Sequence, residues 1–122
     1  MERAEEKITD AELTVMQVLW QAGEPLTMAQ IKAALPGHNG DTTKTLLRRL
    51  CRKGAVEQGK REVYYFRPLV SREAFGGYRT KRLIDKLYAG SAKAMVAALV
   101  EGEQLSAGDV DELRAMFQTL CR

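Results

Sequence analysis

The chain has 122 residues, a hydrophobic fraction of 45% and a net charge of only +3, which fits one domain or a small domain with a short appended unit. Its charged start holds no targeting segment, and no stretch approaches the roughly 20 apolar residues that cross a bilayer, so we expect a cytoplasmic protein without membrane insertion. One histidine, His38, and two distant cysteines, Cys51 and Cys121, give no metal-ligand spacing. We therefore expect no metal and no other cofactor.

The positive charge is concentrated in one segment of the chain. Residues 44–67 carry eight basic and two acidic side chains, a net charge of +6, whereas residues 1–43 carry −4 and residues 91–122 carry −2. A concentrated basic patch is the usual footprint of a site that binds a polyanion. Nucleic acid is therefore the first candidate partner.

Capping signals predict two helices near the start of the chain. Thr9 and Glu12 have the spacing of a capping box, in which a hydroxyl at the helix start is followed by a carboxylate three residues later. They predict a helix that ends near Gln21. Thr27 and Gln30 repeat the same spacing and predict a short second helix, which the following Pro-Gly pair stops.

A third helix and a β-hairpin should follow. Gly40 or Asp41 is expected to cap this helix, and Gly54 suits the left-handed position just after its end. Strands are predicted at residues 55–58 and 63–67, with the intervening residues as the hairpin tip. Three helices followed by a two-stranded hairpin is the order of a winged helix-turn-helix. The expected fold class is therefore mostly α with a small β-hairpin wing.

The remainder of the chain is predicted to be helical. One helix should span residues 71–88, with an interruption at Gly76-Gly77 because glycine is a poor helix former. A second should span residues 91–100, and a capping box at Ser106 should open a third. Each of these helices carries an apolar stripe, so each is expected to bury one face.

The predicted third helix has one apolar and one polar face. At 100° per residue, Thr43 and the apolar side chains that follow it through Cys51 fall within an arc of roughly 140°, which should face the core. Hydroxyls near the helix start suit base edges in the major groove, and arginines suit guanine or phosphate. A basic hairpin tip would lie against phosphates. The predicted DNA-binding residues are Thr42, Lys44, Thr45, Arg48, Arg49, Arg52, Lys53, Lys60 and Arg61.

Three stretches of the chain resemble one known family. Residues 8–20 resemble its opening, "isDAELeVMkvlW", and residues 42–54 are similar to its recognition-helix run, "TvxTlLxRLxxKG". Residues 64–73 look like its wing exit, and a weaker similarity extends to residues 95–96 and 105–113. Together they resemble the penicillinase-repressor (BlaI/MecI/CopY) family of winged-helix transcriptional regulators.

The resemblance implies a bacterial repressor of antibiotic-resistance genes that binds a palindromic operator as a homodimer. It implies a winged helix-turn-helix DNA-binding domain at residues 1–70 and a helical dimerisation domain at residues 71–122. It also implies a membrane-bound sensor-protease as a partner that triggers cleavage of the repressor. Apolar positions of the C-terminal helices are the candidates for the dimer interface: Tyr78, Leu83, Leu87, Tyr88, Leu99, Leu113, Phe117 and Leu120.

The chain departs from the family pattern in three places. The cleaved bond in the family tends to be Asn-Phe, whereas the matching positions here are Ala98-Leu99, so control by cleavage does not follow. The cysteine cluster of the copper-responsive branch is absent, because Cys121 stands alone. Asp41 occupies a position where some relatives carry lysine, and a helix-capping role is expected for it.

Two alternatives stay open beside the repressor. One is a winged-helix module that binds proteins, and the other is a ligand-sensing regulator that proteolysis does not control. An enzyme is not expected, because the chain shows no Gly-rich phosphate loop, zinc-ligand set or Ser/His/Asp pattern. Steep weakening of DNA binding with salt would distinguish a DNA-binding protein from a protein-interaction module.

Overall fold

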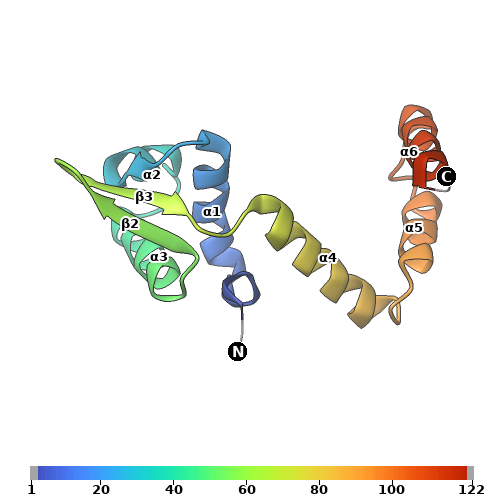
Figure 1. Cartoon of the computed structure of the whole chain (residues 1–122), viewed down its shortest axis with the longest axis horizontal. Helices are drawn as coiled ribbons and strands as arrows, with labels where there is room; N and C mark the ends of the chain where they lie inside the picture. Colours follow the sequence, from blue (N-terminus) through green and yellow to red (C-terminus); the bar gives the residue numbers. More distant parts are fainter. Residues whose placement is uncertain (1–2, 121–122) are drawn as a thin grey trace. The chain divides into compact units, whose positions relative to one another are not determined.

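The computed structural model describes residues 3–120. A short 3-10 helix precedes six α-helices and three short strands (Figure 1). The elements in chain order are η1 (Ala4–Lys7), α1 (Asp10–Ala22), β1 (Leu26–Thr27), α2 (Met28–Ala34), α3 (Gly40–Arg52), β2 (Val56–Lys60), β3 (Tyr64–Pro68), α4 (Arg72–Leu87), α5 (Ala92–Glu101) and α6 (Ala107–Leu120). None of the helices among these residues is both long and apolar enough to span a membrane.

The predicted helix starts at Thr9 and Thr27 are confirmed. The Thr9 hydroxyl accepts a hydrogen bond from the Glu12 N–H at 3.2 Å, and the Thr9 N–H donates to the Glu12 carboxylate at 3.0 Å. Thr27 and Gln30 make the same reciprocal pair at the start of α2. Gly23 ends α1 in the left-handed conformation, with φ of 69°. These local contacts satisfy backbone groups that a helix end leaves without partners.

The prediction that Gly40 or Asp41 caps the third helix is wrong. Asn39 is the N-cap, and its side-chain oxygen accepts the Asp41 N–H at 2.8 Å. Gly40 is already the first residue of α3, and Asp41 stands in the first turn. Asparagine is among the best N-cap residues because its short side chain reaches the free N–H groups of the first turn. An acid in the first turn instead interacts with the positive end of the helix dipole.

The hairpin forms a three-stranded antiparallel sheet, with β3 between β1 and β2. The predicted tip at residues 59–62 is wrong in part, because Gly59 and Lys60 are still paired with Tyr65 and Tyr64. The turn lies between Lys60 and Tyr64, where the Arg61 N–H donates to the Val63 carbonyl at 3.1 Å. Glycine lacks a side chain but keeps both backbone groups, so it does not end the ladder. In Figure 1 the hairpin of β2 and β3 extends beyond the helices as a wing.

Strand β1 was not predicted from the sequence. It has two residues, Leu26 and Thr27, which pair with Phe66 and Tyr65 of β3. Such a strand is too short to show an alternating pattern, and Thr27 also caps α2. Pairing with β3 makes it a strand, and that pairing joins residues about 40 positions apart in the sequence.

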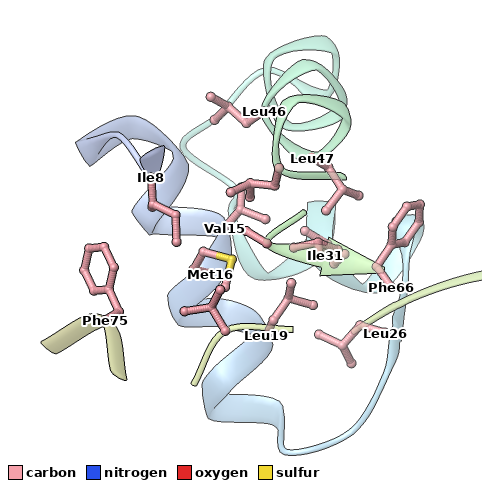
Figure 2. Packing of buried hydrophobic residues seen from close by; sticks show 14 residues of the cluster. Ile8, Val15, Met16, Leu19, Leu26, Ile31, Leu46, Leu47, Phe66 and Phe75 are labelled. Atoms are coloured by element: carbon pink, nitrogen blue, oxygen red, sulfur yellow. The ribbon is translucent and has the colours of Figure 1, made fainter. Parts of the chain in front are cut away.

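The hydrophobic core lies wholly within residues 8–75 of the described chain. Met16 and Val15 of α1 are fully buried, and in Figure 2 they lie between Leu47 of α3 and Phe75 of α4. The strands contribute Leu26 of β1, Val56 of β2 and Phe66 of β3. The buried cluster comprises Ile8, Val15, Met16, Leu19, Leu26, Ile31, Leu46, Leu47, Leu50, Ala55, Val56, Phe66, Val70 and Phe75.

Helix α4 is continuous through Gly76-Gly77, so the predicted interruption is wrong. The chain divides into two compact units, Met1–Arg79 and Thr80–Arg122, and the division falls inside α4. The first unit includes the start of α4 because Trp20 packs on Phe75 with ring centroids 5.7 Å apart. The Trp20 indole N–H also donates to the Val70 carbonyl at 2.8 Å.

The second unit confirms the predicted capping box at Ser106. Its hydroxyl accepts the Asp109 N–H at 3.0 Å, and the Ser106 N–H donates to the Asp109 carboxylate at 3.0 Å. Ser91 caps α5 by accepting the Ala94 N–H. Neither α5 nor α6 contains a buried residue. The predicted apolar stripes on these helices are therefore only partly covered within one chain.

Replacement of the α3 N-cap tests the assignment of Asn39. Asn39→Ala should lower the free energy of unfolding by about 1 kcal/mol, because the acceptor for the Asp41 N–H is lost. Asp41→Ala should lower it by roughly 0.5 kcal/mol, since Asp41 acts on the helix dipole alone. Urea unfolding followed by circular dichroism measures both values. A larger loss for Asp41→Ala than for Asn39→Ala would return the capping role to Asp41.

Candidate nucleic-acid interface

Helix α3 separates an apolar face from a cationic face. Leu47 and Leu50 are fully buried, and Leu46 is 5% exposed. The opposite side is exposed and carries most of the predicted DNA-binding residues: Thr42, Lys44, Thr45, Arg48, Arg49 and Arg52. Among the described residues, none of the four cations in this set takes part in an ion pair. Their positive charge is therefore left uncompensated by the protein.

The wing adds cations at its tip. Lys60 and Arg61 are exposed at the end of the hairpin. The Lys60 ammonium lies over the Tyr64 ring, 5.2 Å from its centroid, which favours a defined direction for an otherwise mobile side chain. The sequence analysis did not predict that Tyr64 would hold Lys60. An aromatic residue close to the lysine at the hairpin turn was the signal that could have indicated it.

Within the basic segment, the positive charge of Arg67 is neutralised by an acidic side chain of the wing itself. Its guanidinium donates two hydrogen bonds to the Glu57 carboxylate, at 3.0 and 3.2 Å, across the β2–β3 pair. Two parallel hydrogen bonds of this kind hold an arginine in a fixed orientation. The pair contributes to the shape of the wing and adds no net charge to it.

Lys53 differs from the other members of the predicted set. Its ammonium donates to the Glu12 carboxylate at 2.5 Å and to the Lys7 carbonyl at 2.9 Å. Glu12 is 1% exposed, so this contact places a buried carboxylate at the C-terminal end of α3. The structure thus engages Lys53 in holding α3 to α1, while its neighbour Arg52 is exposed to solvent.

Glu12 remains ionised despite its burial. Burial raises the pKa of its carboxyl, but the Lys53 ammonium and the hydrogen bonds from Thr9 more than offset that effect and hold the pKa below the ordinary 4.5. Its second oxygen, Oε2, is buried without a hydrogen-bond partner. Removal of the Lys53 charge would therefore leave a buried carboxylate with too few partners.

Lys32 is a further cation that sequence reasoning missed. It lies on α2, and its aliphatic stem runs beside Gly40, where an added Cβ would stand 3.5 Å from Lys32 Cε. The ammonium is thereby near the first turn of α3. No local pattern could reveal this proximity, because it depends on the packing of α2 against α3.

Helix α3 and the wing, which carry this cationic surface, lie in the part of the chain that is similar in sequence to known proteins. A family model described as penicillinase repressor matches residues 8–119. The chain belongs to this family. It is accordingly a DNA-binding transcriptional repressor with a winged-helix fold.

Relatives of the repressor cover almost its whole length. It is 30% identical to the penicillinase repressor of Bacillus licheniformis over 115 residues, which are 92% of this chain and 90% of that protein. It is 28% identical to the methicillin resistance regulatory protein MecI of Staphylococcus aureus (strain N315) over 114 residues, covering 88% and 90%. A solution structure of monomeric Bacillus licheniformis BlaI with the blaP half-operator has 29% identity and a TM-score of 0.49, and covers 56% of this chain and 87% of that one.

Acid should weaken the fold through Glu12. Because its folded pKa lies below 4.5, its contribution is present above about pH 4.5 and is lost as pH falls through the folded value. Glu12→Gln should therefore be less stable than wild type near neutral pH, and its free energy of unfolding should fall less on acidification. Urea unfolding between about pH 7 and pH 3 measures this.

The control for acid unfolding is Glu24→Gln, which removes one exposed carboxylate and so reports the effect of net charge alone. If Glu12→Gln and wild type lost stability in parallel on acidification, Glu12 would not be the group responsible.

Proposed function

We propose that the repressor binds a palindromic operator as a homodimer, with α3 in the major groove and the wing tip against the phosphate backbone. The observation that carries this proposal is the row of exposed, unpaired cations on the face of α3 opposite its buried leucines. A single α-helix fits the major groove, and arginine is suited both to guanine and to phosphate. The wing cations Lys60 and Arg61 extend the same positive surface.

The side chains of α3 fall into two roles. Thr42, Lys44 and Thr45 lie in the first half of the helix, whose residues reach base edges in related docking geometries. Arg48, Arg49 and Arg52 follow and hold phosphates. The Thr45 hydroxyl donates to the Asp41 carbonyl at 2.9 Å, which leaves its oxygen lone pairs and its methyl group for a base. Lys32 adds positive charge beside the helix start, where the Asp41 carboxylate would otherwise repel phosphate.

Arg52 and Lys53 give a matched pair of variants for the DNA contact. Each loses one positive charge on replacement by methionine, and they are adjacent. Arg52→Met should weaken binding to duplex DNA of random sequence several-fold and reduce the salt slope by about one, with little change in stability. Lys53→Met should lower the free energy of unfolding by about 2–3 kcal/mol, because Glu12 loses its partner. Fluorescence anisotropy across a salt series and urea unfolding measure the two effects.

The two variants also separate the alternatives. A reduced salt slope for Lys53→Met but not for Arg52→Met would exchange the roles of these two residues. Absence of binding by the wild-type chain at low salt would overturn DNA binding through α3 and favour a protein-interaction module.

Dimerisation is supported by the apolar surface of residues 80–120. Five of the predicted interface residues are exposed there: Leu83, Leu87, Leu99, Phe117 and Leu120. Leu113 and Tyr88 are partly buried, as is Tyr78 in the first unit. α5, α6 and the loop between them line an open and largely apolar groove, whose lining residues are Val100, Leu105, Val110, Leu113, Arg114, Phe117 and Gln118. A helical unit with no buried residue of its own in α5 or α6 gains its core when a second copy covers these side chains.

Phe117→Asp should give monomers. The side chain is 53% exposed, so the single chain tolerates the charge, whereas a second copy would have to bury it unpaired. Sedimentation should show at least a tenfold rise in the dimer dissociation constant, equivalent to about 1.4 kcal/mol. The exposed Glu103→Lys serves as a control for a charge change in the same unit. A Phe117→Asp variant that sedimented as a wild-type dimer would contradict this interface.

The bond that aligns with the family's cleavage site lies inside α5 (Ala92–Glu101). Ala98 is partly buried and Leu99 is exposed. Cleavage between these residues would require local unfolding of that helix, because its backbone amides are already hydrogen-bonded within it. This geometry favours a release mechanism other than cleavage at Ala98-Leu99.

A further inference from the structure

Arg79, about two turns after the start of α4, holds this helix to the start of α1. Its guanidinium donates to the Asp10 carboxylate at 3.1 Å and to the Ile8 carbonyl at 2.9 Å. The same group lies over the Phe75 ring, 5.0 Å from its centroid. One planar cation thus makes two hydrogen bonds to the segment that begins α1, while its contact with Phe75, four residues earlier, lies within α4.

The end of α3 contacts the same segment at the preceding backbone carbonyl, that of Lys7. Lys53, just beyond the end of α3, donates to the Lys7 carbonyl, and Arg79 of α4 donates to the next carbonyl along, that of Ile8. The two cations also take carboxylates two residues apart in the first turn of α1, Glu12 and Asp10. A single short segment therefore links the end of α3 to α4 on both sides of a buried residue, Ile8.

A second attachment holds the first turn of α4. Trp20 bonds to the Val70 carbonyl, packs on Phe75 and lies under the Arg72 guanidinium, which is 5.9 Å from the indole ring. With only this attachment, α4 would be held at its beginning. Arg79, about two turns after Arg72, gives α4 a second point of attachment, to the start of α1.

This attachment has a consequence for a dimer that reads two half-sites. The half-sites of a palindrome stand at a fixed separation, and each recognition helix must meet its own groove. In the proposed dimer, a loose attachment of α4 to the first unit would let each recognition helix move relative to that of the second copy. A rigid attachment penalises a wrong spacing, and a loose one tolerates it.

We propose that Arg79 is a positioning residue that sets how strictly the repressor discriminates the spacing of operator half-sites. It acts by locking α4 to the Lys7–Ile8 segment that the recognition helix also holds. The Arg79–Asp10 ion pair is exposed and contributes little by itself, since Asp10 is 89% exposed. The bond to the Ile8 carbonyl carries the restraint, and the contact with Phe75, which lies within α4, holds the guanidinium in place for it. This inference rests on the proposed dimeric operator binding.

The test compares whole and half operators. A palindrome is first selected by the full-length wild-type chain from randomised duplexes, and its spacer is then lengthened or shortened by about one to three base pairs. Affinities for these duplexes and for a single half-site are measured for wild type, Arg79→Gln and Arg79→Lys. The control is Lys81→Gln, which removes one exposed positive charge from the same helix.

Wild type and Lys81→Gln should lose about tenfold or more in affinity when the spacer changes, whereas Arg79→Gln should lose no more than about threefold. Arg79→Lys should show the same small spacing penalty as Arg79→Gln. A lysine ammonium cannot reach both acceptors and also lie over the Phe75 ring, as the planar guanidinium does. All variants should bind the single half-site as wild type does, since Arg79 is not part of the DNA-facing surface.

Three results would overturn the inference. Equal spacing penalties in Arg79→Gln and wild type would show that Arg79 does not set the spacing. A parallel loss on half and whole sites would make Arg79 a DNA contact or a residue needed only for folding. If Arg79→Lys showed the same spacing penalty as wild type, the positive charge at position 79 would be sufficient, and the guanidinium contacts would not set the spacing. Failure of the proposed function looks different, because the wild-type chain would then select no palindrome.

Discussion

Burial of one face of α3 against α1 is the constraint on which the DNA-binding surface depends. Leu46, Leu47 and Leu50 can enter the core in only one rotational setting of the helix, and that setting turns the arginines outward. The buried Glu12–Lys53 contact then fixes the end of the helix by charge as well as by packing. Orientation of the reading face is thus a by-product of forming the core, and needs no contact with DNA to establish it.

The start of α1 serves three parts of the molecule at once. Its capping box begins the helix, its Glu12 carboxylate holds the end of α3, and the preceding Ile8 carbonyl holds Arg79 of α4. Short-range capping and long-range attachment therefore share one carboxylate. This sharing explains why a residue that reads as a helix cap from the sequence is also a buried charge of the core.

The two units use apolar side chains in opposite ways. Residues 8–75 bury theirs within one chain, whereas α5 and α6 present theirs on the surface. Under the proposed dimerisation, this unit would gain stability from the apolar area that a second copy covers. In the proposed dimer, one association between two copies would both cover the apolar side chains of the second unit and bring two α3 helices to the operator.

Local chemistry in the sequence determined most of the fold and the outward face of α3. Capping boxes act over three residues, and the helical wheel orders one helix, so both are readable without tertiary structure. Contacts between distant segments were not readable. Strand β1 exists only through pairing with β3, and Lys32 reaches α3 only through packing. Arg52 and Lys53 are alike in charge and adjacent in sequence; only the tertiary structure separated them, because Glu12, 41 residues from Lys53, is buried within reach of one of them.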